Sequence, residues 1–145
     1  MRKIMLVAGL VLMATGAQAR SAHTQSTWDG VYTEDQAARG QTAYRQNCGR
    51  CHGPDLSGTF EVPPLVGRFA TYWSGSTVDV LVDYITRAMP LGRPGSLSPA
   101  TNADITAFLL KSNGFPAGGK ELGPESKDQK LITFDAIKKK RAKAQ

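Results

Sequence analysis

The two cysteines of this 145-residue chain lie three positions apart and are followed at once by a histidine, in the run Cys48-Gly49-Arg50-Cys51-His52. At the end of a helix, two thiols at this spacing can both bond to the vinyl groups along one edge of a porphyrin. The histidine then lies beneath the ring, where its imidazole can bind the iron. The motif predicts one covalently attached haem c, with Cys48 and Cys51 as the thioether donors and His52 as an axial ligand.

Three other uses of the cysteines fit the sequence less well. A redox-active dithiol belongs at the strand-to-helix turn of a βαβ unit, and the sequence indicates no such unit. A zinc site needs four ligands. Beyond residue 19 the nitrogen and sulfur donors of this kind are Cys48, Cys51, His52 and His23, at a spacing unlike that of a zinc finger. A disulfide between the cysteines would close a strained small ring and leave the histidine unexplained.

A haem that transfers electrons needs a second strong axial ligand, so that its geometry changes little between oxidation states. Met89 is the only methionine beyond residue 19, and it begins a loop rich in proline and glycine, 37 residues after His52. A thioether ligand favours Fe(II) and raises the reduction potential. We expect Met89 to be this ligand. The alternatives are a gap-filling core methionine, ligation by His23, or an iron left open.

Four residues are candidates for the surroundings of the haem. Pro63, or its neighbour Pro64, could present a backbone carbonyl to the ring N–H of the histidine and so fix its tautomer. Arg68, Trp73 and Arg93 could bind the haem propionates by charge or hydrogen bonds. The simpler interpretations are an ordinary loop proline, surface arginines and a packed tryptophan.

The first helix signal is a capping residue, Thr33, with Gln36 at the capping-box position. This pattern predicts a helix to about residue 47. Gly40 and Tyr44 lie four positions apart and therefore share one face, as Ala37 does. A missing side chain at Gly40 would let another helix cross closely, with Phe108 or Leu109 packed on Tyr44.

Two further helices are expected. Thr77 can cap a helix over residues 78–88, and Ser98, followed by a proline at the first helical position, can cap one that ends at about residue 112. Gly114 is a plausible stop signal. The apolar positions with helical spacing, which we expect to be buried, are Val78, Leu81, Val82, Ile85, Ile105, Phe108 and Leu109.

The segment 53–76 is rich in glycine, proline and turn residues, and we expect it to be a loop. A loop of this length is unusual in a compact domain, but it is reasonable if it wraps a large ligand. No strand signal of useful length is present. The predicted fold is therefore all-α, with three main helices and long loops around one covalently bound haem.

Residues 1–19 have the three parts of a secretory signal peptide. Two basic residues precede an apolar run of eleven residues, and Ala17-x-Ala19 forms the small-residue cleavage site. The run is well short of the roughly 20 residues that span a bilayer as a helix. We expect a mature protein that begins at Arg20 and is located in the periplasm.

The positive charge of the chain, +6, is unevenly distributed. Residues 20–119, the predicted haem-binding domain, contain eight basic and eight acidic side chains, so a nucleic-acid partner has no support. Residues 120–145 form a basic extension with eight basic and four acidic side chains. Within it we expect residues 131–137 to dock on the domain and the last eight to be disordered. Contact with a membrane or an acidic partner would reside in this extension.

With these motifs placed, residues 33–115 resemble a class I, mono-haem cytochrome c. The likeness rests on Gly40 and Tyr44, the Cys48–His52 motif, Pro63-Pro64-Leu65, Met89-Pro90 and the final helix. Residues 28–33, together with Met89-Pro90 and residues 94–97, are more similar to a bacterial subgroup that accompanies periplasmic quinoprotein or sulfur-compound dehydrogenases.

The resemblance implies an all-α fold with one exposed haem edge, and single-electron transfer between larger redox proteins. We therefore expect a monomeric electron carrier that is not an enzyme. A periplasmic dehydrogenase would be its donor, and an oxidase or another cytochrome its acceptor. Two alternatives are a haem subunit of an oxidoreductase complex and a ligand-binding or sensing haem from which Met89 is displaced.

Overall fold

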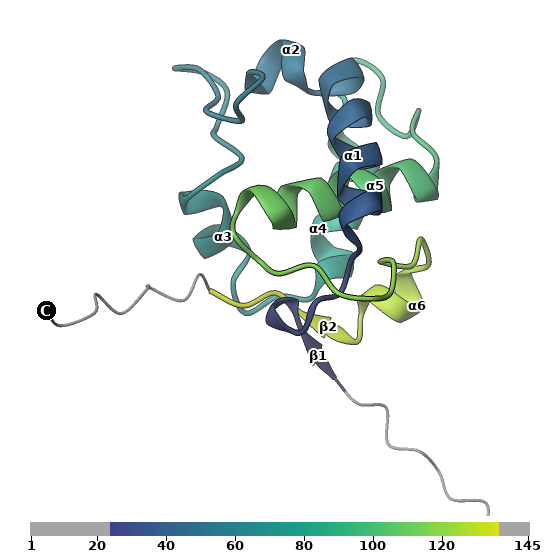
Figure 1. The fold of residues 1–145 in the computed structure, drawn as a ribbon. Coiled ribbons are helices and arrows are strands. Elements are labelled where there is room, and N and C mark those ends of the chain that lie inside the picture. Colours follow the sequence, from purple (N-terminus) through teal and green to yellow (C-terminus); the bar gives the residue numbers. More distant parts are fainter. Residues whose placement is uncertain (1–23, 137–145) are drawn as a thin grey trace, which may run out of the picture.

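The structure, a computed structural model, describes residues 24–136, and its regular elements are nearly all helices, joined by long loops (Figure 1). The predicted signal peptide, His23 and the last eight residues lie outside the described residues. No helix within 24–136 is long and apolar enough to cross a membrane. In chain order the elements are β1 (Gln25–Ser26), η1 (Thr27–Asp29), α1 (Glu34–Asn47), α2 (Gly49–His52), α3 (Arg68–Trp73), α4 (Val78–Ala88), α5 (Pro99–Ser112), α6 (Ser126–Gln129) and β2 (Ile132–Thr133).

The three predicted main helices are confirmed as α1, α4 and α5, and the apolar positions expected inside are all buried. Ser98 caps α5 by accepting a hydrogen bond from the Thr101 amide, and Gly114 follows the helix with a φ of 83°. Thr77 stands at the N-cap of α4, but its hydroxyl donates to the Asp79 carboxylate instead of accepting from the helix. The all-α prediction therefore holds, with small differences at the caps.

The capping box predicted for α1 is only half correct. Thr33 Oγ1 accepts a hydrogen bond from the Gln36 amide at 3.1 Å, as expected. The Gln36 side chain, however, is buried and turns to Leu122, donating to its carbonyl at 2.9 Å and accepting from its amide at 2.7 Å. Buried amide side chains are generally hydrogen-bonded, and the Leu122 backbone supplies a partner for both the NH2 group and the carbonyl oxygen of Gln36.

The close crossing predicted at Gly40 is confirmed, and α5 is the helix that crosses α1 there. A Cβ atom at Gly40 would lie 1.8 Å from the Asp104 carbonyl oxygen and 3.0 Å from Phe108 Cβ. One turn further along α1, the rings of Tyr44 and Phe108 pack with their centroids 5.3 Å apart. Glycine at this position therefore allows the close approach of α1 and α5.

We expect Gly40→Ala to destabilise the protein by about 3 kcal/mol, because its methyl group would force two helix backbones apart. In an uncrowded helix the same change stabilises by up to about 1 kcal/mol. A loss of stability in Gly40→Ala would therefore indicate that α5 crosses α1 closely at this position. Gly119→Ala is the matched control, since a Cβ atom at Gly119 would have no other atom within 4 Å. Chemical denaturation measures both; equal stability of the two variants would contradict the crossing.

The expectation that residues 53–76 form an unbroken loop is wrong, because they include α3. This helix has only six residues and buries Phe69 and Ala70. Six residues are too few to establish a helical period in a sequence. The remainder of the segment is loop, as expected.

The C-terminal residues described by the structure pack on the same core as α1, α4 and α5. Ile132 and Phe134 are buried, as predicted for the docking segment, and the Phe134 ring contacts Phe69 and Phe115. The two-residue strands β1 and β2 pair in parallel, with Gln25 opposite Ile132. The two ends of the described chain are thereby held together.

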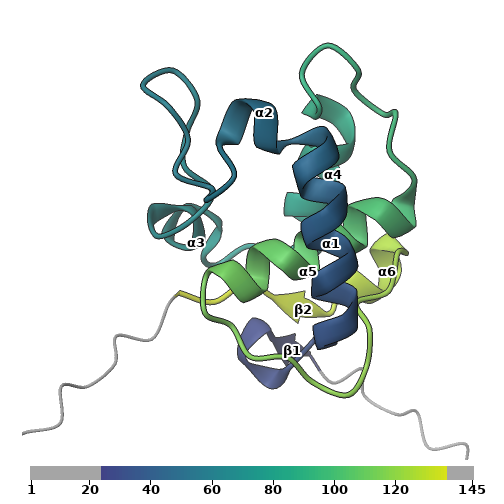
Figure 2. The same cartoon turned by 45° about the horizontal axis from the view of Figure 1, so that its top comes forward.

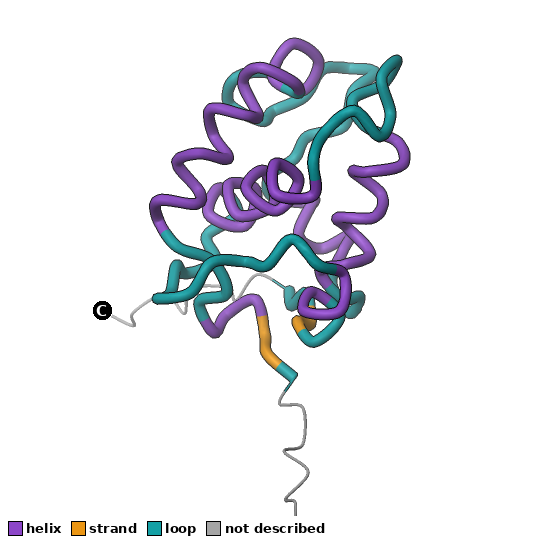
Figure 3. The backbone as a smooth tube through the Cα atoms, turned by 90° about the vertical axis from the view of Figure 1, so that its right-hand side faces the viewer, coloured by secondary structure: helices purple, strands orange, loops and turns teal. Residues whose placement is uncertain are grey.

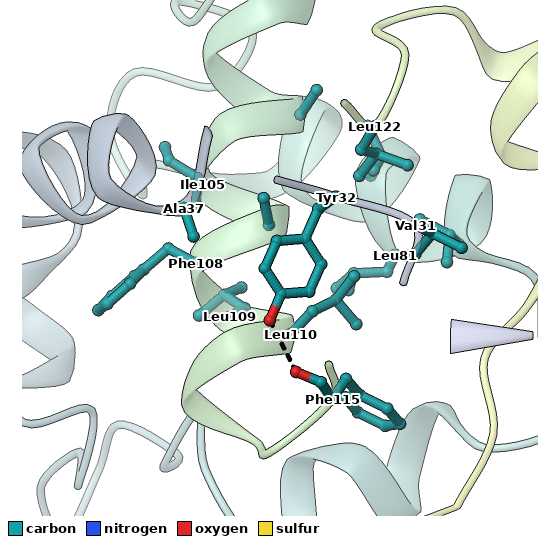
Figure 4. Close-up of a cluster of buried hydrophobic side chains, with 14 of the residues drawn as sticks. Val31, Tyr32, Ala37, Leu81, Ile105, Phe108, Leu109, Leu110, Phe115 and Leu122 are labelled. Atoms are coloured by element: carbon teal, nitrogen blue, oxygen red, sulfur yellow. Dashed lines mark hydrogen bonds between the residues drawn. The ribbon is translucent and has the colours of Figure 1, made fainter. Parts of the chain in front are cut away.

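The core lies around α5, whose side chains meet those of α1, α4 and the segments on either side of them. Figure 4 shows Tyr32 in the middle of this cluster, where its hydroxyl donates to the Phe115 carbonyl at 2.7 Å. Because a buried hydroxyl costs free energy unless it is hydrogen-bonded, this contact lets a polar side chain occupy the core.

The elements divide the molecule into two ends. The short helix α2 and the loops around it lie at one end, and the β1–β2 pair lies at the other (Figures 1 and 2). The tube in Figure 3, turned by 90°, shows the same division, with the strands below the main helices. The helix α2, which carries the cysteine–histidine motif, and the strands near the two ends of the described chain therefore lie at opposite ends of the molecule.

Candidate haem site

The predicted attachment motif lies at the junction of α1 and α2. Cys48 ends α1 by donating its amide hydrogen bond to the Tyr44 carbonyl at 2.8 Å. Its own carbonyl then accepts from the amides of Cys51 and His52, at 3.1 and 3.0 Å, which forms the single turn of α2. Both thiols are free; that of Cys48 is half-buried and that of Cys51 is exposed. This placement between two helices differs from the strand-to-helix turn of a thioredoxin-like dithiol.

The His52 ring is buried, with 8% of the residue exposed, and it is oriented by one hydrogen bond. Its Nδ1 lies 3.0 Å from the carbonyl oxygen of Pro63. A carbonyl can only accept, so Nδ1 carries the proton and Nε2 keeps its lone pair. This is the form in which a histidine binds a metal, with its second nitrogen held by a backbone carbonyl.

The loop that brings Pro63 to His52 depends on Gly58, a residue that the sequence pattern did not single out. The Gly58 amide donates to the His52 carbonyl at 2.9 Å. A Cβ atom at Gly58 would lie 2.2 Å from the Val62 carbonyl oxygen, and the φ of 70° also favours glycine. One signal was available, a glycine within a turn-rich segment, but it did not distinguish Gly58 from its neighbours.

Asn113 is a second residue that sequence reasoning missed. Its buried side chain donates to the Leu65 carbonyl and to the Leu109 carbonyl, both at 2.9 Å. It therefore ties the loop that carries Pro63 to the end of α5. Its Oδ1 is buried and has no hydrogen-bond partner among the described residues.

Met89 is the residue at which α4 ends. Its amide donates to the Ile85 carbonyl at 2.9 Å, and its half-buried side chain packs against the core. The loop that follows returns to the helix, since the Gly95 amide donates to the Thr86 carbonyl at 2.8 Å. These backbone hydrogen bonds on either side of Met89, the predicted second ligand, fix the position of its backbone.

The other residues predicted around the haem lie in different settings. Arg93 Nη2 is 3.5 Å from Asn47 Oδ1, so the loop after Met89 reaches the residue that precedes Cys48. Trp73 is half-buried at the end of α3, with its ring centroid 6.3 Å from that of Phe69 and 5.7 Å from that of Tyr84. Arg68 is exposed at the start of α3.

Burial shifts two ionisations beside the motif. The pKa of the Cys48 thiol is raised to about 11, first by burial and then by the neighbouring Cys51 sulfur. The pKa of Tyr44 is raised to about 12, by burial and then by the charges of Cys48 and Asp55. Both groups are therefore neutral at pH 7, and the Tyr44 hydroxyl is a firm donor to the Gly53 carbonyl, at 2.7 Å.

The donor set fits haem c. Two free thiols on one helical turn match the two vinyl groups of the porphyrin, and the imidazole that follows them has its tautomer set for ligation through Nε2. A thioether at the end of α4 is a ligand that iron accepts in electron-transfer haems. Tetrahedral zinc would require four closed ligands, and residues 24–136 contain no group of three or more histidine, cysteine or acidic side chains placed to hold a metal ion.

Residues 35–109 match the family described as cytochrome c oxidase, cbb3-type, subunit III. The chain belongs to this family of c-type cytochrome domains. Its cofactor is haem c, and the role of the domain is electron transfer. The resemblance to a mono-haem cytochrome c is therefore confirmed at the level of family, fold and cofactor.

Named relatives of this cytochrome act on sulfur compounds. The chain is 32% identical over 79 residues to the thiosulfate dehydrogenase of Stutzerimonas stutzeri, covering 50% of this chain and 26% of the relative. It is 33% identical over 85 residues to that of Allochromatium vinosum, covering 53% and 32%. The alignments thus span about a quarter to a third of the relatives' lengths.

A solved structure supports the fold. The cytochrome is similar to a chain in the crystal structure of the sulfane dehydrogenase SoxCD from Paracoccus pantotrophus, with a TM-score of 0.50 and 26% identity over 74% of this chain and 61% of that chain. The similarity covers more of the cytochrome than the curated relatives do.

Proposed function

We propose that this cytochrome is a periplasmic mono-haem electron carrier that exchanges single electrons with redox proteins and transforms no substrate itself. The observation that carries the proposal is the state of His52, which follows the two cysteines directly, is buried, and has Nδ1 held by the Pro63 carbonyl. This arrangement leaves Nε2 as the only ring nitrogen available to an iron.

In this proposal Cys48 and Cys51 would hold the haem by thioether bonds, and His52 and Met89 would bind its iron. When bound, the haem supplies one-electron exchange between Fe(II) and Fe(III). The chain's own part is to keep both ligands in place in either oxidation state. Burial of the His52 ring and the backbone hydrogen bonds that end α4 at Met89 serve this purpose.

Arg93, Arg68 and Trp73 are proposed to surround the haem, with Pro63 acting through His52. Arg93 has the strongest support, since it reaches Asn47 beside the motif. Trp73 has an alternative use in the aromatic packing between α3 and α4.

The proposed donor is a periplasmic dehydrogenase, and the named relatives favour one that oxidises a sulfur compound. The proposed acceptor is an oxidase or another cytochrome. The location follows from the predicted signal peptide over residues 1–19. With His52 and Met89 both bound to the iron, no coordination position would be left for a substrate, which favours a carrier over an enzyme.

This proposal predicts that the purified ferric cytochrome does not catalyse the oxidation of thiosulfate when no other protein is present. A sulfur-compound dehydrogenase and its substrate together should reduce it, one electron per chain. Absorbance of the haem bands follows both reactions, and ferricyanide regenerates the ferric form. Sustained ferricyanide consumption with thiosulfate and no dehydrogenase would show that the chain is itself the enzyme and would overturn the carrier proposal.

A further inference from the structure

One side chain joins the loop at residues 53–67, which carries Pro63, to a later part of the chain. In Figures 1 and 2 this loop runs along one side of the molecule from α2 to α3, and the end of α5 lies beside α3. The Leu65 amide bonds within the loop, to the Leu56 carbonyl at 2.8 Å. The Leu65 carbonyl accepts from Asn113 Nδ2 at 2.9 Å. Among the described residues, no other side chain beyond residue 67 hydrogen-bonds to this loop.

Asn113 is itself held in place where α5 ends. Its amide donates to the carbonyls of Leu109 and Leu110, at 3.1 Å each. Its buried Nδ2 donates to the Leu109 carbonyl as well as to the Leu65 carbonyl, both at 2.9 Å. An amide nitrogen has two hydrogens in one plane, one for each carbonyl. A single side chain therefore joins the end of α5 to the loop in a fixed geometry.

The capping of α5 alone does not explain an asparagine at this position. A helix end needs one side-chain donor at most for each carbonyl, and a hydroxyl can supply it. One residue earlier, Ser112 Oγ donates to the Phe108 carbonyl at 2.8 Å. Asn113, in contrast, leaves its Oδ1 buried and without a partner among the described residues, which costs free energy. What the asparagine provides in addition is the second donor, which reaches Leu65.

The connection from Leu65 back to Pro63 is stiff. Only Pro64 separates the two residues. The rings of both prolines fix their φ angles, and a residue that precedes a proline is restricted to extended conformations. A shift of the Leu65 carbonyl would therefore also move the Pro63 carbonyl. That second carbonyl lies 3.0 Å from His52 Nδ1 and orients the ring.

We propose that Asn113 is a positioning residue that keeps the Pro63 carbonyl on His52 Nδ1 and thereby lowers the reduction potential of the haem iron. A hydrogen bond donated by Nδ1–H makes Nε2 a more basic ligand, and a more basic ligand favours Fe(III) over Fe(II). Without the bond from Asn113 to the loop, this effect weakens and the potential rises. The inference rests on the proposed function, in which His52 binds the iron.

The test replaces Asn113 in the full chain carrying its haem. Asn113→Leu keeps the approximate shape of the side chain and removes both donor hydrogens. Asn113→Ser keeps one donor, which suffices for the Leu109 carbonyl but not for the loop as well. We expect the midpoint potential of both variants to rise by about 28 mV, a roughly threefold shift toward Fe(II) at about 59 mV per tenfold change.

Ser112→Ala is the matched control. It removes one side-chain hydrogen bond from the same turn of α5, and the hydroxyl that it removes bonds Phe108 and not the loop. We expect it to lose stability in chemical denaturation, as the Asn113 variants do, and to keep the wild-type potential.

Proton NMR of the ferrous protein observes the orienting bond directly. The Pro63 carbonyl protects the His52 Nδ1–H, so its exchange with water should be slow in the wild type and in Ser112→Ala. We expect exchange about tenfold faster in Asn113→Leu and Asn113→Ser, because the loop opens more often.

A loosened fold would change the potential in the opposite direction, since water admitted to the site stabilises the more highly charged ferric iron. A potential that falls or stays the same in haem-loaded Asn113 variants would therefore overturn the proposal, and so would unchanged Nδ1–H exchange. If Asn113→Leu fails to fold, Asn113→Ser, which keeps a donor at the helix end, gives the answer. Absence of haem from the wild type would overturn the carrier proposal and this one together, whereas an unchanged potential in loaded variants would overturn this one only.

Discussion

Cys51→Ala and His52→Ala should each abolish the normal holo-protein. Loss of Cys51 removes one of two covalent links, and loss of His52 removes the axial ligand that the Pro63 carbonyl orients. Expressed in a host able to attach haem c, the wild-type chain should have a mature mass increased by one haem. The two variants should yield little or none of this species, a decrease of at least tenfold relative to the wild type.

Arg50→Ala provides the matched control for this experiment. Arg50 lies inside the motif, between the two cysteines, but its side chain is exposed and has no proposed bond to the cofactor. The Arg50→Ala variant should carry haem as the wild type does. A wild-type mass without haem, or Cys51 and His52 variants that load normally, would refute the assignment of the attachment site.

Met89→Ala should open one axial position of the iron. We expect the absorbance band at the red end of the ferric spectrum, which marks methionine ligation, to vanish. We also expect the reduction potential to fall, because a thioether stabilises Fe(II) over Fe(III). A tenfold loss of this preference corresponds to about 59 mV for one electron, and we expect at least that much.

Leu91→Ala is the control for Met89→Ala, since it truncates an exposed side chain of the same loop. Its spectrum and potential should match those of the wild type. If Met89→Ala retained the red band, another residue would be the second ligand. His23, which lies outside the described residues, would then be tested by the same spectroscopy.

Much of this fold could be predicted because its decisive signals are local. The cap at Thr33, the Ser98-Pro99 pair and the apolar periods set the bounds of three helices correctly. Gly40 could be interpreted because a glycine within a helix lowers stability unless a neighbour needs the space. The Cys48–His52 motif is equally local, since five consecutive residues specify the chemistry.

Several of the missed features depend on contacts between distant segments. Gln36 forms its hydrogen bonds with Leu122, 86 positions away. Asn113 holds the carbonyl of Leu65, 48 positions away. Neither contact leaves a period or a motif in the sequence. The short helix α3 was missed for a related reason, because it buries Phe69 against Phe134, which is 65 positions away in the sequence.

The Pro63 carbonyl is an instructive intermediate case. A proline after a haem motif suggested a backbone acceptor for the histidine, and the hydrogen bond is present at 3.0 Å. The sequence left two prolines open, and the loop geometry decides between them. That geometry depends on Gly58, whose close approach to Val62 only the three-dimensional structure reveals.

In our proposal, His52 and Met89 would both bind the iron, so that the protein carries electrons and no external ligand binds there. Potentiometric titration of the wild-type holo-protein, with and without carbon monoxide, tests it most directly. A gas that binds only the ferrous form would raise the midpoint potential by mass action. We predict a one-electron transition whose midpoint is the same under both atmospheres. A midpoint that rises under carbon monoxide would show an open iron and contradict this claim.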